Sequence, residues 1–308
     1  MKFLVTGAGG LLGAYLVHHL YKVGYEVVAL ARHYVPRLKG MTSYRVDLVS
    51  EADRAKEIIL DEVPDWVVHC AAMTDLAECE KRKRDAQLNN ASATERISMV
   101  CSDLGCNMLY ISTDNVYPGR LGGGFSETDL CYALNEYALS KQEGEDRAIG
   151  NYEGARQGQL LIVRESHYGW NAHGGQKASL PESIIRALNS GQSWDAWSNV
   201  FFSPIYCGSL CIILEQMMLD NMRGIFNVGC QERISKYQFA SAVAEIWKLP
   251  FNNVHSTLYS PKAGEPSRPL DVSLNCRRAY SAGYIMPHII SDLEIMQDDP
   301  GDHRRMFE

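Results

Sequence analysis

The sequence predicts a doubly wound α/β fold, in which a parallel sheet of Rossmann type is followed by a smaller C-terminal α/β region. Two observations carry this prediction. Short apolar and β-branched runs alternate with helical patterns through the first 165 residues, and such alternation is typical of parallel strands joined by crossover helices. In addition, the first apolar run leads directly into a glycine-rich turn that opens a helix.

Strands are predicted where short, largely apolar runs stand between turn signals. They are Lys2–Thr6, Glu26–Ala31, Ser43–Val46, Trp66–Cys70, Asn107–Ser112, Gln159–Arg164 and Gly224–Val228. Helices are predicted where apolar residues recur every three or four positions. They follow Gly13 and cover Ala52–Leu60, Ala91–Leu104, Asn135–Ile149, Pro181–Leu188, Ser209–Leu219 and Ser235–Trp247.

The alternation loosens beyond Ser166. The stretches Asn171–Gly175 and Asn189–Ser203 are rich in Gly, Asn and Ser, which is typical of loops or of a lid. We therefore predict one domain over residues 1–165, to which residues 203–229 return. Residues 166–202 and 230–308 are predicted to form the second, substrate-binding region.

Composition excludes several classes of protein. The 308 residues are 46% hydrophobic and 22% charged, as in an ordinary globular protein. A net charge of −7 argues against nucleic acid or an anionic membrane as a partner. No apolar stretch reaches the roughly 20 residues that cross a bilayer, and no signal peptide opens the chain. The nine cysteines are scattered without a C-x-x-C, so we expect free thiols and a cytoplasmic location.

The glycine-rich turn predicts a dinucleotide site. Gly7, Gly10 and Gly13 stand between a strand and a helix, which is the context that a dinucleotide fingerprint requires. Glycines at these positions let the chain turn sharply and let backbone N–H groups approach a pyrophosphate. The helix that begins near Leu11 and Leu12 adds partial positive charge at its N-terminus.

The end of the second strand indicates which dinucleotide is bound. An acidic residue there would accept hydrogen bonds from ribose hydroxyls and favour NAD. Here the strand ends in Arg32 and His33, and a guanidinium suits a 2′-phosphate. We therefore predict NADP(H), with NAD(H) as the alternative.

A tyrosine and a lysine predict the chemistry. Tyr137 and Lys141 are four residues apart, on one face of a predicted helix. A neighbouring ammonium favours phenolate and so brings a phenol closer to its working range. The strand Asn107–Ser112 runs out into Thr113, whose hydroxyl would meet a substrate oxygen at the carboxyl end of the sheet.

Together these motifs resemble the extended short-chain dehydrogenase/reductases, and within them the dTDP-4-dehydrorhamnose reductase-like family of nucleotide-sugar 4-ketoreductases. The resemblance covers nearly the whole chain. It rests on Thr6–Gly13, Val46–Leu48, His69–Ala72, Met73–Asp75, Glu78–Glu80, Asn90 with Ala93–Thr94, Ile111–Tyr117, Tyr137 with Lys141, Val163–Ser166, Tyr168–Gly169, Phe202–Pro204, Gly224–Gly229 and Arg268–Leu274.

The resemblance implies a set of site residues. The implied catalytic group is Thr113, Tyr137 and Lys141. The cofactor-binding residues are Gly7, Gly10, Leu11, Leu12, Gly13, Arg32, His33, Asp47, Leu48, Cys70, Ala71, Ala72, Asn90, Tyr137 and Lys141. The substrate residues are Thr74, Asp75, Thr113 and Arg268. No metal is expected, because Ala14 and Tyr15 follow Gly13 where some relatives carry a magnesium-binding glutamate.

The reaction implied is reduction of the C4 ketone of a nucleotide-linked 4-keto-6-deoxy sugar, with hydride from NADPH and a proton from Tyr137. Three alternatives stand beside it. A 4,6-dehydratase would need a second carboxylate after Asp114, where Asn115 stands. The others are an epimerase with bound NAD and a non-catalytic NADP-binding regulatory subunit like the methionine adenosyltransferase β subunit. A homodimer is left open.

Two further features have two interpretations each. Glu165 stands where a small residue is common, and is either a satisfied structural group or a group that selects a polar sugar. Trp194 and Trp197 either stack on a nucleobase or form a small apolar cluster. The sequence alone does not choose between these.

Overall fold

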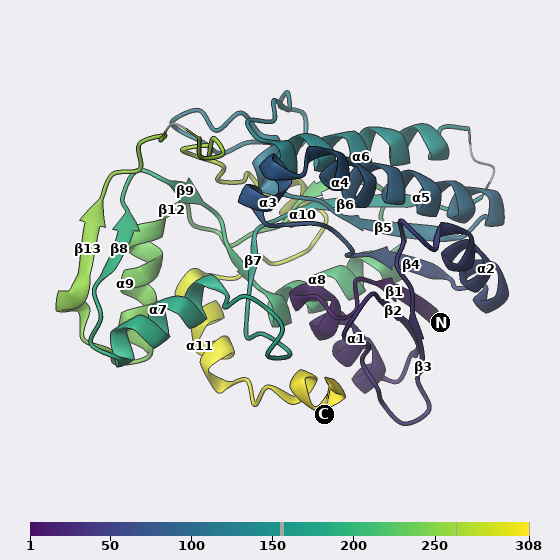
Figure 1. Cartoon of the computed structure of the whole chain (residues 1–308), viewed down its shortest axis with the longest axis horizontal. Helices are drawn as coiled ribbons and strands as arrows, with labels where there is room; N and C mark the ends of the chain where they lie inside the picture. Colours follow the sequence, from purple (N-terminus) through teal and green to yellow (C-terminus); the bar gives the residue numbers. More distant parts are fainter. Residues whose placement is uncertain (155–156, 263, 308) are drawn as a thin grey trace.

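The computed structural model describes residues 1–154, 157–262 and 264–307. Its centre is a seven-stranded, fully parallel sheet in the order β11-β6-β5-β4-β1-β2-β3 (Figure 1). The strands are β1 (Lys2–Thr6), β2 (Glu26–Ala31), β3 (Thr42–Arg45), β4 (Trp66–His69), β5 (Asn107–Ile111), β6 (Leu160–Arg164) and β11 (Gly224–Asn227). The predicted fold class is confirmed.

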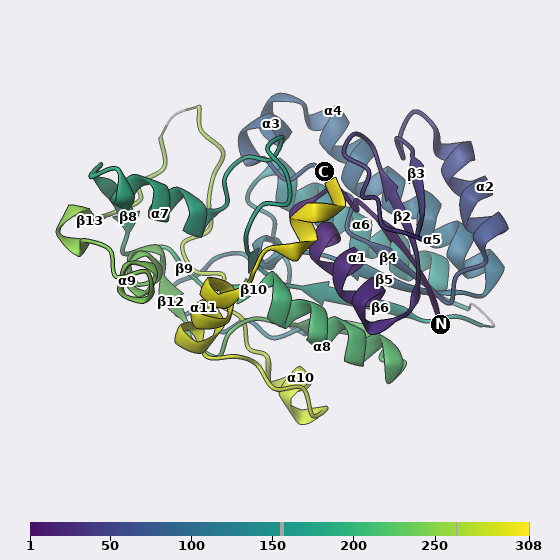
Figure 2. The same cartoon turned by 90° about the horizontal axis from the view of Figure 1, so that it is seen from below.

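Helices cover both faces of the sheet because both faces are apolar. Alternate residues of a strand point to opposite faces. Phe3 and Val5 accordingly pack with α1 (Leu11–Val23) and α8 (Cys207–Leu219). Leu4 packs with the helices of the other face, which are α2 (Ala52–Glu62), α5 (Ala93–Leu104) and α6 (Glu136–Tyr152). Figure 2 shows the two layers on either side of the sheet.

The strand order places the site. β1 pairs with β2 on one side and with β4 on the other, so the direction of winding reverses beside β1. Ligands of open α/β folds bind at such a reversal, outside the carboxyl ends of the strands. The glycine turn after β1 and the segments after β4, β5 and β6 all emerge at this edge.

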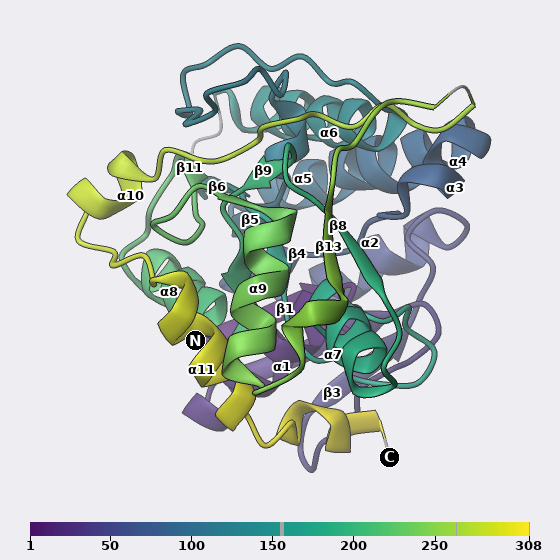
Figure 3. The same cartoon turned by 90° about the vertical axis from the view of Figure 1, so that its left-hand side faces the viewer.

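The C-terminal region is built from small elements. It contains α7 (Leu180–Asn189), α9 (Lys236–Ile246) and α11 (Ile289–Asp298), with β8 (Trp194–Trp197) paired in parallel to β13 (Val254–Thr257) (Figure 3). Shorter elements are β7 (His167–Tyr168), β9 (Phe201–Phe202), β10 (Ile205–Tyr206), β12 (Ile234–Ser235), α10 (Arg277–Ser281) and the 3₁₀ helices η2 (Asp114–Val116), η3 (Phe251–Asn253) and η4 (Asp302–Phe307).

Two segments differ from the sequence prediction. Asn189–Ser203, expected as a loop, contains β8 and β9, because each finds a partner strand far along the chain. The stretch after β4 is more helical than expected: it holds α3 (Leu76–Lys81), α4 (Lys83–Ala86) and the π-helix η1 (Gln87–Ser92). Local periodicity predicts neither the strands β8 and β9 nor the π-helix η1, because contacts with residues distant in the sequence stabilise them.

All nine cysteines lie in the described part of the chain and are free thiols. Among the described residues, no helix combines the length and the apolar character needed to span a membrane. Nor do those residues bring three or more His, Cys, Asp or Glu side chains together as a metal-binding group.

Candidate active site

The glycine turn packs tightly against the segment that follows β4, the strand that neighbours β1 in the sheet. Gly7 has a φ of +66°, and a Cβ there would lie 2.6 Å from the Ala71 nitrogen. A Cβ on Gly13 would lie 2.2 Å from the Gly7 carbonyl oxygen. Only glycine therefore fits either position. The turn leaves the first backbone N–H groups of α1 facing outward, as anion binding requires.

A cavity of about 470 Å³ opens beside this turn, and we name it the cofactor-side cavity. Eleven of the residues predicted from the sequence line it. They are Gly7, Gly10, Arg32, His33, Asp47, Leu48, Cys70, Ala71, Ala72, Thr74 and Asp75. The glycine cradle and the Arg32 guanidinium at the end of β2 together fit a dinucleotide, because the first can receive a pyrophosphate and the second a 2′-phosphate.

Charged side chains of both signs line the cofactor-side cavity. Arg32 is half exposed, and its guanidinium lies 3.8 Å from the Asp47 carboxylate. Burial alone would raise the pKa of Asp47, but the N–H groups of Val49 and Ser50 and the charge of Arg32 outweigh burial and lower it. Arg82 lines the same cavity. It stands in the basic run Lys81–Arg84 and was not among the residues predicted from the sequence.

A second cavity of about 440 Å³ adjoins the first, and we name it the substrate-side cavity. The two cavities share Gly9, Gly10 and Thr74 as lining residues. Thr113 and Tyr137, predicted from different parts of the sequence, both line the substrate-side cavity, as does Leu11. An oxygen of a bound molecule can therefore meet a threonine hydroxyl and a phenol beside the dinucleotide cradle.

Burial shapes the acid–base character of Tyr137. It raises the pKa of this phenol, and hydrogen bonding with Thr113 lowers it only in part. The phenol therefore keeps its proton at neutral pH. Burial also raises the pKa of the adjacent Asp114 to about 6, while the charge of Lys236 opposes the rise.

Lys141 differs from the sequence expectation. Its ammonium donates a hydrogen bond of 2.6 Å to the Ile111 carbonyl and lies 4.0 Å from the centre of the Tyr110 ring. The ammonium is drawn toward the end of β5, and Lys141 is not among the main groups that shift the pKa of Tyr137. Burial lowers the pKa of Lys141 itself to about 8, so the site holds its cation weakly.

Besides Lys141, four predicted residues lie outside both cavities. The Leu12 side chain is buried in the core, and Gly13 packs against Gly7. The amide of the fully buried Asn90 accepts from the Met73 N–H at 2.7 Å and donates to the Met73 carbonyl at 2.9 Å. Asn90 thus holds the lining segment in place from behind. The guanidinium of Arg268 lies 5.6 Å from the centre of the Trp197 ring.

A loop of the C-terminal region reaches across to the glycine turn. His173 Nε2 lies 2.9 Å from the Gly9 carbonyl oxygen, and Gln176 donates to the same oxygen at 3.1 Å. The His173 ring stacks on Tyr34, with centroids 3.7 Å apart. We call residues 170–177 the lid, since they join the two sides of the cavity entrance.

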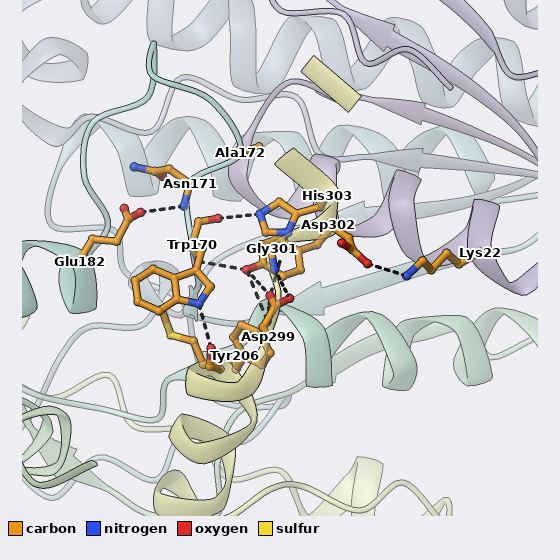
Figure 4. A network of polar contacts seen from close by, with 12 residues as sticks. Lys22, Trp170, Asn171, Ala172, Glu182, Tyr206, Asp299, Gly301, Asp302 and His303 are labelled. Carbon is orange, nitrogen blue, oxygen red and sulfur yellow. Dashed lines mark hydrogen bonds and ion pairs between the residues drawn. The ribbon is translucent and has the colours of Figure 1, made fainter. Parts of the chain in front are cut away.

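The C-terminal segment anchors the lid (Figure 4). His303 lies 3.1 Å from the Trp170 carbonyl oxygen, and the Trp170 indole donates to the Met296 carbonyl at 2.8 Å. Tyr15 of α1 donates to Asp299 at 3.1 Å and accepts from the Trp170 N–H at 3.0 Å. The Tyr15 hydroxyl therefore ties α1 to Trp170, the residue at which the lid begins, and the Asp299 carboxylate holds that hydroxyl in place.

Asp299→Ala is expected to loosen the lid. The change removes the acceptor of both Tyr15 and Tyr206, and unpaired buried hydroxyls are costly. We expect faster amide hydrogen exchange in residues 170–177 and a several-fold weaker Kd for the dinucleotide. Asp298→Ala, at the exposed neighbouring position, is the control. Unchanged exchange in the lid would show that the anchor plays no part.

Comparisons with known proteins agree with this geometry. The model of the RmlD substrate binding domain matches residues 1–298. The probable low-salt glycan biosynthesis reductase of Haloferax volcanii is 26% identical over 278 residues, which cover 89% of this chain and 90% of that protein. Methionine adenosyltransferase 2 subunit beta of Bos taurus is 26% identical over 295 residues, covering 92% of this chain and 82% of that one.

A solved structure shows the same fold. The dTDP-4-dehydrorhamnose reductase of Bacillus anthracis in complex with NADP superimposes with a TM-score of 0.83 and 20% identity, covering 96% of this chain and 98% of that one. Fold and site define the class of this protein as an NAD(P)-dependent oxidoreductase of the extended short-chain dehydrogenase/reductases. Within that class the chain belongs to the RmlD substrate binding domain family. The resemblance seen in the sequence is confirmed.

Proposed function

We propose that this protein uses NADPH to reduce the C4 ketone of a nucleotide-linked 4-keto-6-deoxy sugar. The observation that carries the proposal is the pair of adjoining cavities, one lined by the glycine turn and the other by Thr113 and Tyr137. In this scheme residues 1–165 and 203–229 hold the cofactor. Residues 166–202 and 230–308 hold the sugar nucleotide.

The side chains have separate roles in the proposed reaction. NADPH supplies the hydride when bound. Thr113 donates a hydrogen bond to the ketone oxygen, and Tyr137 donates its proton to the same oxygen as negative charge develops there. Lys141, one turn along α6 from Tyr137, would supply positive charge to the phenolate left behind once its ammonium leaves the Ile111 carbonyl.

A cluster of aromatic and basic groups suits the nucleotide. The guanidinium of Arg268 lies over Trp197, whose ring centre is 4.9 Å from that of Tyr259. The Tyr259 hydroxyl is buried and has no hydrogen-bond partner. A nucleobase stacks on aromatic rings and brings hydrogen-bonding groups, while a diphosphate suits a guanidinium. We therefore assign the nucleotide to this cluster and the sugar to Thr74 and Asp75.

Arg32→Ala is expected to reduce the preference for NADPH over NADH by about 10- to 100-fold, the range of a hydrogen bond to a charged group. The reason is that Arg32 is the guanidinium nearest the end of β2, where the 2′-phosphate of NADPH would lie. The ratio of kcat/KM for the two cofactors measures the effect. Arg54→Ala, on the outer surface of α2, is the control. An unchanged ratio contradicts the assignment.

A second candidate function is a regulatory subunit, and the similarity to Methionine adenosyltransferase 2 subunit beta favours it. A subunit of this kind needs the fold and the cofactor site but no proton donor. The joint placement of Thr113 and Tyr137 in one cavity is the reason we rank the reductase first.

One experiment separates the two functions. Purified protein is given NADPH with dTDP-, GDP-, CDP- and UDP-linked 4-keto-6-deoxy sugars, and the nicotinamide absorbance is followed. Oxidation of NADPH with at least one sugar supports the reductase. NADPH binding without turnover on any member of the panel overturns the reductase and leaves the regulatory role.

A further inference from the structure

Glu165 is a buried carboxylate with one oxygen unsatisfied. It directly follows β6, and its side chain is 3% exposed. Oε1 lies 2.8 Å from His167 Nδ1, whereas Oε2 is buried and has no hydrogen-bond partner. Among the buried side-chain atoms without a partner in the described parts of the chain, it is the only carboxylate oxygen. Glu165 is therefore not the satisfied structural group that one interpretation of the sequence expected.

The unsatisfied oxygen belongs to the reaction site. Glu165 and His167 line the substrate-side cavity together with Thr113 and Tyr137. The charge of Glu165 acts to raise the pKa of both Tyr137 and Asp114, which shows how near it lies to them. The carboxylate thus stands within the cavity in which the ketone is proposed to react.

His167 determines which oxygen of Glu165 is paired and which remains free to accept a hydrogen bond. Burial alone would lower the pKa of His167, but the Glu165 carboxylate outweighs burial and raises it. The imidazole therefore donates its Nδ1 proton to Oε1, and this leaves Oε2 as a pure acceptor. The other charged groups that act on this pair are Asp114 and Lys141, and the Lys141 ammonium is already bonded to the Ile111 carbonyl.

An empty acceptor of this kind needs an explanation. Leaving a buried polar group unpaired costs about 1–3 kcal/mol, and more when it is charged. Native proteins rarely tolerate this outside functional sites. The neighbouring carboxylate Glu145 shows the contrast, because Arg164 saturates both of its oxygens. A donor from a molecule bound in the substrate-side cavity would satisfy Glu165.

We propose that Glu165 Oε2 accepts a hydrogen bond from a hydroxyl or amino group on C3 of the sugar, and so selects 4-keto sugars that carry a donor next to the ketone. This inference rests on the proposed function. The choice of C3 follows from the substrate's chemistry: in a 4-keto-6-deoxy sugar, C5 carries only a methyl group and the ring oxygen. C3 is then the only ring neighbour of the ketone that can present a donor.

Glu165→Gln tests the proposal. Its amide oxygen would accept from His167, so its uncharged NH₂ group would replace Oε2 and could no longer accept a hydrogen bond from the sugar. We expect KM for the 3-hydroxy sugar to rise about 10- to 100-fold, with little change in KM for the matching 3-deoxy sugar. The Kd for NADPH should not change. The wild type itself should prefer the 3-hydroxy sugar over the 3-deoxy sugar.

The controls keep the test specific. Glu215→Gln alters another glutamate–histidine pair, with His19 at 2.6 Å, which lines neither cavity. It should leave both KM values unchanged. If Glu165→Gln does not fold, Glu165→Asp replaces it, because the shorter side chain keeps the charge but moves it away from the sugar. The preference of the wild type for the 3-hydroxy sugar over the 3-deoxy sugar can be measured without any variant.

The outcomes are distinct. Equal KM increases for the 3-hydroxy and 3-deoxy sugars would indicate a structural role and overturn the proposal. A weaker NADPH Kd with unchanged KM would assign the acceptor to the cofactor, and would also overturn it. If the wild type reduces none of the sugars, the proposed function fails. Calorimetric binding of the 3-hydroxy and 3-deoxy sugar nucleotides to wild type and Glu165→Gln then still tests Glu165 separately.

Discussion

The Tyr137→Phe variant is expected to lose about 10²- to 10⁴-fold in kcat, the usual contribution of a positioned proton donor. Phenylalanine keeps the ring that lines the substrate-side cavity but removes the proton that the ketone oxygen needs. Because the glycine turn and Arg32 are untouched, the Kd for NADPH should stay within a few-fold of the wild-type value. The expected signature is therefore a cofactor-loaded protein that does not turn over.

Turnover is measured from the nicotinamide absorbance with the best sugar of the panel, and cofactor binding from fluorescence titration. Tyr132→Phe is the matched control, because Tyr132 is 68% exposed and lines neither cavity. Its kcat should equal that of the wild type. Full activity of Tyr137→Phe would remove the proposed role of the phenol.

Glu145→Ala is expected to lower the free energy of unfolding by about 3–5 kcal/mol, the usual cost of breaking a buried ion pair by removing one partner. Glu145 of α6 and Arg164 of β6 are 2% and 4% exposed. The Arg164 Nε donates to Glu145 Oε1 at 3.0 Å, and Nη2 donates to Oε2 at 2.5 Å. Without Glu145, the buried guanidinium keeps one hydrogen-bond partner within the described residues, the Tyr117 hydroxyl, 3.0 Å away.

Urea unfolding of both proteins measures the change. The matched control is Glu143→Ala on the same helix, whose partner Arg147 lies 3.3 Å away and where both side chains are more than one-third exposed. An exposed pair contributes at most about 1 kcal/mol. If the two variants were equally stable, the buried pair would not fasten α6 to the sheet as the structure indicates.

The sequence predicted the parts of the site that follow directly from strand ends. Gly7 and Gly10 come after β1, Arg32 after β2 and Thr113 after β5, and parallel strands bring their carboxyl ends to one edge. Tyr137 lies at that edge because it is the second residue of α6, which begins there and then runs back along the sheet. Position along the chain was therefore enough to place these residues near one another.

The sequence did not predict side-chain direction. Lys141 shares a helix face with Tyr137, yet it bonds to the Ile111 carbonyl. Asn90 matches a site motif, yet it lies buried behind the cavity and holds Met73. Periodicity assigns a residue to a face of an element, but the nearest available partner then decides which way the side chain turns. Arg82 was missed for the same reason, since a basic run does not reveal which of its members faces a cavity.

By itself, then, the sequence determined the class of fold and the strand edge at which the two cavities lie, and it predicted residues that line them. These depend on contacts between neighbours in the chain and on the alternation of strand and helix, which are local. Only the tertiary structure decided that β8 pairs with β13, that the lid reaches Gly9, that Asp299 anchors the lid, and that Glu165 is left with an unpaired oxygen. Each of these depends on groups distant in sequence whose meeting is favoured by packing and by the need to pair buried polar atoms, and no local pattern records such a meeting.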